Sequence, residues 1–301
     1  MAGRGHGLGT EAVLRNHLKG QPLQKEPVPF SAGFWAEVVD RAESALAAGA
    51  MHSFECELEY VQHEGVEFVL RVATKFPQGE TAKGRTDAAP KLPRNPFLSP
   101  DPRLVVRDVT ATHRAMLNKF SVLREHLLVV TKEFEEQRTP LTERDFEALA
   151  ACMADAEVLA FFNGGAEAGA SQPHKHLQVV TLPLSPRHSI PMDTLLERDQ
   201  DRLPFRHAFA RLSPGEAARP TEVHAIYRRL LSEAAVEPPQ PYNLLITHEW
   251  MLVVPRSRDK YEGISINSLA FSGSFFVRDA KHASILAQAG PMNVLKSVAM
   301  P

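Results

Sequence analysis

Apolar residues recur along this chain with two periods, which predict separate helices and strands. Spacings of three and four residues predict helices over residues 32–48, 143–156 and 221–235, and a short helix over 280–288. Alternating or continuous apolar runs predict strands. The expected strands cover residues 53–61, 66–73, 115–120, 126–131, 158–163, 174–182, 242–247, 251–254, 263–269 and 273–277.

Short turns join most neighbouring strands. Residues 63–65 supply one such turn and residues 248–250 supply another. Connections of this length favour antiparallel pairing, whereas parallel strands need long crossovers. We therefore expect an α+β fold with a mainly antiparallel sheet flanked by helices. Each half of the sequence contains a pair of strands that ends in an apolar run, at residues 126–131 and at residues 251–255. This similarity is compatible with a duplicated half-unit.

The regular patterns begin after residue 30. Residues 1–30, with four early glycines and three prolines, are typical of a flexible lead-in. The rest is expected to form one globular unit, in which residues 31–195 are the catalytic half and residues 196–301 complete the site. Prolines interrupt residues 75–102, and five basic side chains stand between 75 and 94. That segment is either a solvated loop or a basic flap over an anionic substrate.

Charge and composition exclude several classes of protein. The 301 residues include 34 basic and 36 acidic side chains, so the net charge of −2 provides no general attraction for nucleic acid or an anionic membrane. No membrane span or secretory signal is apparent. Cys56 and Cys152 are too few for a disulfide framework and are expected to be buried. We expect a cytoplasmic protein of undetermined oligomeric state, with no nucleic acid or membrane partner.

A row of polar side chains marks one predicted strand. Because side chains alternate along a strand, His174, His176 and Gln178 share one face. The opposite face, with Leu177 and Val179, can pack into a core.

Three interpretations of this row are open. The histidines could be ordinary polar residues satisfied by their neighbours. They could bind zinc, although further ligands would have to come from distant histidines such as His113, His126 or His188. One imidazole could instead attack phosphorus and form a covalent intermediate. The glycine-rich residues 164–172 favour the third interpretation, because such turns can direct backbone N–H groups at phosphate oxygens.

Residues 163–178 resemble the signature of the ATP adenylyltransferases, the diadenosine tetraphosphate phosphorylases of the histidine-triad superfamily (HIT-like, GalT branch). Segments 117–134, 242–257 and 266–278 are similar to further blocks of that family, in the same order. The resemblance implies a HIT-like fold and reversible nucleotidyl transfer, in which diadenosine tetraphosphate and phosphate give ATP and ADP. A divalent cation, Mg²⁺, is expected to accompany the nucleotide, with no tightly bound cofactor.

The resemblance also implies roles for single residues. His176 is the implied nucleophile, and His174 is the implied supporting group. Gln178 stands where the hydrolase branch has a third histidine. Since an amide cannot exchange a proton near neutral pH, this implies a transferase. The implied nucleotide and phosphate ligands are Lys75, Asn118, Lys119, Asn163, Gly169, Ala170, Ser171, Gln172, Asn267, Ser268 and Arg278.

Two alternatives are left open by the sequence. The same fold could phosphorolyse another dinucleotide or a nucleotide sugar, or the chain could be a catalytically silent nucleotide-binding protein. The base, the preferred acceptor and the direction of the reaction are not determined by these residues.

Overall fold

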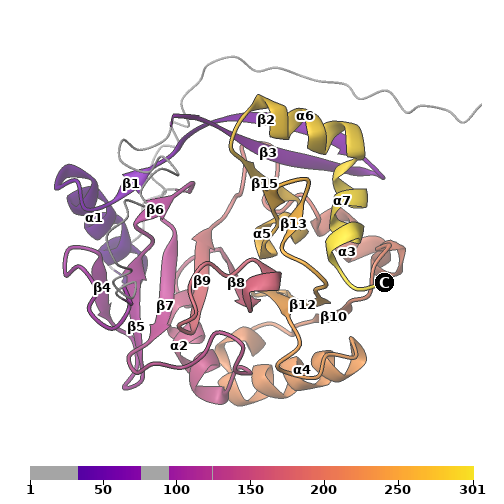
Figure 1. Ribbon diagram of the computed structural model, residues 1–301. Helices are drawn as coiled ribbons and strands as arrows, with labels where there is room; N and C mark the ends of the chain where they lie inside the picture. Colours follow the sequence, from indigo (N-terminus) through magenta and orange to yellow (C-terminus); the bar gives the residue numbers. More distant parts are fainter. Residues whose placement is uncertain (1–32, 76–94, 124) are drawn as a thin grey trace, which may run out of the picture.

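An antiparallel sheet of eight strands lies at the centre of the molecule (Figure 1). The computed structural model describes residues 33–75, 95–123 and 125–301. The strands in spatial order are β10 (Ala208–Arg211), β12 (Trp250–Pro255), β11 (Tyr242–Ile246), β8 (Val158–Gly164), β9 (His176–Thr181), β7 (Leu127–Thr131), β5 (His113–Leu117) and β4 (Val105–Asp108). Every neighbouring pair is antiparallel. β8 and β9 occupy the middle, and β8 pairs with β11, so both halves of the sequence share one sheet.

Helices α1 (Phe34–Ala47), α2 (Glu143–Met153) and α4 (Pro220–Glu233) pack on one face of this sheet. Their apolar sides share a core with inward-facing strand residues such as Leu177 and Val179. Helix α2 begins with a capping box, in which Thr142 and Asp145 satisfy each other's backbone N–H groups. This cap places the Asp145 carboxylate against the sheet.

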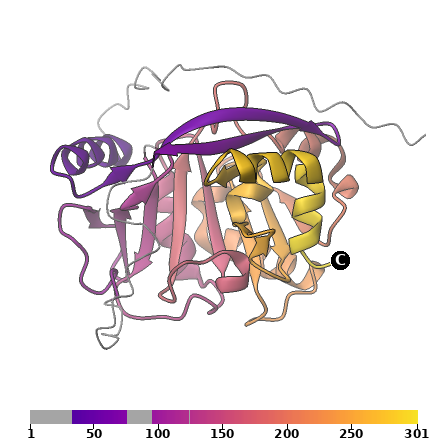
Figure 2. The same ribbon diagram turned by 45° about the horizontal axis from the view of Figure 1, so that its top comes forward.

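A second layer covers the other face. It contains the small sheet of β15 (Ser274–Val277), β3 (Val66–Lys75) and β2 (Glu55–His63), and Figure 2 shows the β2–β3 hairpin arching over the central strands. The helices of this layer are α3 (Asp193–Asp199), α5 (Ser268–Phe271), α6 (Ala280–Ala289) and α7 (Pro291–Val298). The short elements are β1 (His52–Ser53), β6 (Phe120–Ser121), β13 (Lys260–Tyr261), β14 (Ile264–Ser265), η1 (Ala166–Ala168), η2 (Gln200–Arg202) and η3 (Glu216–Ala218).

The expected α+β architecture is confirmed, and some elements need correction. Residues 263–269 do not form one strand, because the Asn267 side chain accepts a hydrogen bond from the Leu269 N–H and starts α5. Helix α7 was not expected, and residues 183–220 contain α3 and β10. His174 forms only an isolated bridge with Glu136, so β9 begins at His176.

Part of the expected organisation cannot be compared with the structure. The lead-in, residues 1–30, and the basic residues 83, 85, 91 and 94 lie outside the described residues. Within the described ranges no helix is long and apolar enough to cross a membrane.

Candidate active site

The first residue of β9 is the expected nucleophile, His176. Its side chain is 4% exposed, and its Nδ1–H donates a 2.8 Å hydrogen bond to the carbonyl oxygen of His174. Burial lowers the pKa of His176 to about 4, so the ring is neutral at pH 7. A neutral ring that donates from Nδ1 carries its lone pair on Nε2. Nε2 has no hydrogen-bond partner among the described residues, so this nitrogen is chemically available.

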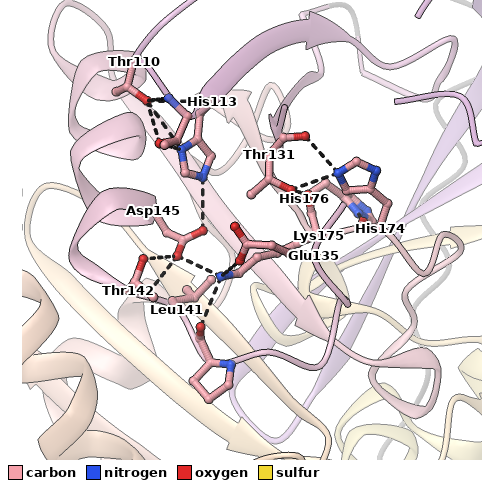
Figure 3. A network of polar contacts seen from close by, with 12 residues as sticks. Thr110, His113, Thr131, Glu135, Leu141, Thr142, Asp145, His174, Lys175 and His176 are labelled. Atoms are coloured by element: carbon pink, nitrogen blue, oxygen red, sulfur yellow. Dashed lines mark hydrogen bonds and ion pairs between the residues drawn. The ribbon is translucent and has the colours of Figure 1, made fainter. Parts of the chain in front are cut away.

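His174 is held on both sides of its ring. Its Nε2–H lies 2.9 Å from the carbonyl oxygen of Thr131, and the amide of Asn95 lies 2.9 Å from Nδ1. Burial lowers its pKa as well. Figure 3 shows the ring turned toward Thr131. With both nitrogens engaged, His174 can orient its neighbour but has no free lone pair; its supporting role stays a prediction.

Gln178 is oriented by His126. The His126 Nε2–H donates to Gln178 Oε1 at 2.8 Å, and Asn118 Nδ2 lies 3.3 Å from the other ring nitrogen. Burial lowers the pKa of His126 to about 4, so the ring is neutral and Nδ1 accepts from Asn118. The oxygen of Gln178 is therefore engaged within the protein, which leaves its NH₂ group as a donor. His126, the first residue of the predicted strand 126–131, fixes this orientation.

Lys175 lies between the two histidines in sequence but points to the opposite face. Its ammonium is fully buried and donates to Asp145, Glu135 and the carbonyl of Pro140, at 2.9, 3.1 and 3.2 Å (Figure 3). Although burial alone would raise the pKa of Asp145, its hydrogen bond from His113 and the charge of Lys175 lower it to about 2. This ion pair fastens the start of β9 to the start of α2.

Asn163 and Ser268 come from distant parts of the sequence and lie in contact. Asn163 is 1% exposed, and its Oδ1 accepts from the Ser268 N–H at 2.9 Å and from Asn243 Nδ2 at 2.9 Å. The Ser268 hydroxyl lies 2.7 Å from the same oxygen. With Oδ1 occupied, Asn163 has only its NH₂ group left to offer a ligand. Ser268 is buried and its polar groups face Asn163 and Phe162, and its expected contact with a nucleotide stays a prediction.

The Arg256 side chain contacts Asn243, which in turn contacts Asn163. Its guanidinium is 1% exposed and donates to Asn243 Oδ1 at 2.5 Å and to the carbonyl of Ala168 at 3.3 Å. Two further bonds go to the carbonyls of Val298 and Arg258. Burial lowers its pKa to about 9, so it stays protonated at pH 7. Among the described residues no carboxylate lies within ion-pairing distance of this cation.

The glycine-rich turn packs closely on the C-terminal half. Gly169 has a φ of +92°, and a Cβ there would come within 2.9 Å of the Asn267 backbone. Glycine is therefore required both by the backbone conformation and by the close approach. The turn thus lies beside Asn267, and their contact with one nucleotide stays a prediction. Ser171 is exposed, and Gly169, Ala170 and Gln172 are partly exposed.

The remaining expected ligands lie further out or are engaged elsewhere. Lys119 is exposed, and its Nζ lies 5.2 Å from the centre of the Phe120 ring. Lys75 ends β3, and the exposed Arg278 follows the neighbouring β15. No contact among the described residues joins Lys119 or Arg278 to His176. The Asn118 side chain is directed at His126. Contacts of a nucleotide with Asn118, Lys119, Lys75 and Arg278 therefore stay predictions.

Sequence reasoning missed Asn243 and Arg256 as individual site residues. A signal was present, because each is a polar residue within or directly after an otherwise apolar strand. Such residues are buried only when their polar groups are satisfied. Asn95 and Phe97 were also missed, and the Phe97 ring lies 5.2 Å from that of His176.

The described residues offer no set of side chains that could bind zinc. Over the described ranges, no group of three or more His, Cys, Asp or Glu side chains is arranged to hold a metal ion. His113 binds Asp145, and His188 binds Glu67. Cys152 is buried as expected, whereas Cys56 is only partly buried.

Comparison with known proteins agrees with this geometry. The Ap4A phosphorylase N-terminal domain matches residues 24–198, and the ATP adenylyltransferase C-terminal domain matches residues 201–301. Diadenosine 5',5'''-P1,P4-tetraphosphate phosphorylase 2 of Saccharomyces cerevisiae is 30% identical over 64% of this chain and 72% of its own length. Protein APA1 of the same yeast is 27% identical over 56% of this chain and 62% of its own length.

A solved structure shows the same fold. The crystal structure of yeast Ap4A phosphorylase Apa2 in complex with Ap4A has a TM-score of 0.76 at 23% identity, over 90% of this chain and 99% of that one. The HIT-like architecture expected from the resemblance is therefore confirmed. Given the two domain matches, which together span residues 24–301 with a two-residue gap, the chain belongs to the family of Ap4A phosphorylases, the ATP adenylyltransferases.

Proposed function

We propose that this protein catalyses the reversible phosphorolysis of diadenosine tetraphosphate (Ap4A) to ATP and ADP, through an adenylyl group held covalently on His176. The observation that carries the proposal is the state of the His176 ring. It is neutral, its Nδ1–H is donated to the carbonyl of His174, and Nε2 is left with a lone pair. A fixed imidazole of this kind is a nucleophile that needs no separate base.

In the first step the lone pair of Nε2 attacks an α-phosphorus of Ap4A. A bond forms between nitrogen and phosphorus, the bond from that phosphorus to the bridging oxygen breaks, and ATP leaves with the bonding electron pair. The ring gains positive charge as the bond forms. The carbonyl of His174 stabilises that charge, because it accepts the Nδ1–H.

In the second step an oxygen of inorganic phosphate attacks the adenylyl phosphorus. The nitrogen–phosphorus bond breaks, its electrons return to Nε2, and ADP is formed. Gln178 can donate a hydrogen bond to a phosphoryl oxygen but cannot take a proton from water. Water is therefore a poor acceptor, while the phosphate anion needs no deprotonation to attack.

Amide and backbone donors suit the anionic substrate. The free NH₂ groups of Asn163 and Gln178, together with the turn of residues 169–172, offer hydrogen bonds to phosphoryl oxygens. The groups that surround His176 are amides and imidazoles, whereas Mg²⁺ prefers several oxygen ligands. We therefore propose that a divalent cation enters as part of the nucleotide substrate, held by its polyphosphate.

The test is turnover of Ap4A with and without phosphate. The proposal expects ATP and ADP in equal amounts when phosphate is present, and little ATP and AMP when it is absent. Parallel reactions with diguanosine tetraphosphate and with a nucleotide sugar would measure the base and substrate preference. Rapid hydrolysis of Ap4A without phosphate, or no turnover of any of these substrates, would contradict the proposal.

A further inference from the structure

The central sheet separates next to His176. β8 and β9 pair in a register that sets Phe161 opposite Gln178, and the pairing ends there. Continued by two residues, the same register would set Asn163 opposite His176. β8 nevertheless stays paired with β11 as far as Gly164, and β9 stays paired with β7 as far as His176. The two strands therefore part from each other while each keeps its outer neighbour.

The side chain of Gln137 fills the gap. Its Nε2 donates to the carbonyl of Asn163 at 2.8 Å and to the carbonyl of His176 at 3.1 Å. Its Oε1 accepts the N–H of His176 at 2.8 Å. Gln137 is 3% exposed. Like a peptide group, a primary amide has a carbonyl acceptor and an N–H donor, and it carries one further N–H, so this side chain replaces the missing part of the ladder.

Backbone pairing brings Gln137 to this place. The Gln137 N–H donates to the carbonyl of Pro173 at 2.8 Å, and the N–H of Lys175 donates to the carbonyl of Glu135 at 2.8 Å. Between these bonds Glu136 and His174 form an antiparallel bridge. Residues 135–137 thus lie alongside residues 173–175, and the Gln137 side chain reaches from there between the two central strands.

We propose that Gln137 is a positioning residue of the reaction, whose inserted amide sets the spacing between the strand of His176 and the strand of Asn163. This inference rests on the proposed function. The nucleophilic nitrogen and the Asn163 amide must act on one phosphoryl group, and a bridged gap keeps them at a fixed separation. A direct ladder would close the strands, and an unbridged gap would leave the N–H of His176 without a partner.

Conservative variants separate this role from simple stabilisation. Gln137→Glu keeps the size of the side chain but, when ionised, has no donor for the two carbonyl oxygens. Gln137→Asn keeps the amide but is one methylene, about 1.5 Å, shorter. We expect kcat with Ap4A and phosphate to fall about 100-fold in Gln137→Glu and about tenfold in Gln137→Asn, since small displacements of reacting groups have effects of this size. KM for Ap4A should change by less than about threefold, because the binding groups remain.

The pH dependence of Gln137→Glu gives a second readout. A protonated carboxyl group regains one O–H donor, so its activity relative to the wild type should rise as the pH falls from 8 to 5.5. Because protonation of this buried carboxyl group also raises stability, activity is compared per folded molecule at each pH. A residue needed only for stability would not produce the trend in that comparison.

Thr247→Val is the matched control. Thr247 is 6% exposed, and its Oγ1 accepts the N–H groups of Glu249 and Trp250 in the β11–β12 turn, at the end of β11 away from Asn243. The Thr247→Val variant should be less stable than the wild type but should keep its kcat. If the wild type is active and all three variants lose activity only in proportion to their unfolded fraction, the inference is overturned. If the wild type itself has no phosphate-dependent turnover, the proposed function fails instead.

Discussion

Two buried cations flank the candidate active site, one in each half of the central sheet. Lys175, on the β9 side, is fully buried and ion-paired with Asp145 and Glu135. Arg256, on the β11–β12 side, is equally buried, but its hydrogen bonds go to three carbonyl oxygens and to Asn243 Oδ1. The charge of Lys175 is therefore neutralised by direct ion pairs, whereas the hydrogen bonds of Arg256 go to neutral groups and the Asp259 carboxylate acts on it only from beyond ion-pairing distance.

The difference separates an anchor from an electrostatic support. A paired cation adds little field at the site and mainly holds β9 against α2. An unpaired buried cation in a medium of low polarity acts over a longer distance, and Arg256 lies behind the turn proposed to bind phosphate. We therefore expect substitutions of Lys175 to affect mainly stability, and substitutions of Arg256 to affect mainly the handling of anionic ligands.

The largest expected effect is on stability. Lys175→Met leaves the buried Asp145 carboxylate without its lysine partner, which should lower the free energy of unfolding by about 3–5 kcal/mol. Lys132→Met is the control, because Lys132 pairs with Asp108 at the surface, 2.7 Å away, and its loss should cost less than about 1 kcal/mol. Denaturant unfolding measures both values. Equal losses for the two variants would show that Lys175 is not an anchor.

A smaller effect is expected at Arg256. Arg256→Met removes the charge and should weaken binding of AMP about tenfold, which corresponds to about 1.4 kcal/mol, while leaving the binding of uncharged adenosine nearly unchanged. Arg256→Lys keeps the charge and should recover part of the AMP affinity. Calorimetric titration with both ligands checks this. An equal loss of affinity for AMP and adenosine would mean that Arg256 acts only by shaping the turn.

The smallest expected effect is that of pH on the rate of adenylylation. In the proposed mechanism the neutral form of His176 is the nucleophile, and its pKa is lowered from 6.5 to about 4, so the neutral form persists until the pH falls through about 4. The single-turnover rate of adenylylation by Ap4A should therefore stay nearly constant between pH 7.5 and pH 5.5. A rate that falls in step with a group of pKa 6.5 would show that His176 is not desolvated as described.

The two sides of the site differ in how far the sequence predicts them. His174, His176 and Gln178 stand within five residues, so strand periodicity alone places them on one face. Asn163, Asn243, Arg256 and Ser268 are spread over more than 100 residues. Their contacts depend on the pairing of β8 with β11 and on the position of α5, which local patterns do not specify.

Gln137 and Lys175 show a second limit of sequence reasoning. The alternation of β9 predicts that Lys175 faces the core side, but it does not reveal the carboxylate supplied by α2. Gln137 lies in a loop with no periodicity, and its role follows only from the separation of β8 and β9. The fold class and the proposed nucleophile were therefore accessible from local patterns and resemblance, whereas the groups that hold the site in place required the three-dimensional arrangement.

The account depends most directly on covalent chemistry at His176. The decisive measurement is mass mapping of peptides after Ap4A is mixed with the protein in phosphate-free buffer and the mixture is quenched in alkali, where a phosphoramidate bond survives. The account predicts one adenylyl group on the peptide that contains His176, absent from His176→Ala and released as ADP when phosphate is added before the quench. An unmodified peptide from a protein that turns over Ap4A, or an adenylyl group on another residue, would contradict it.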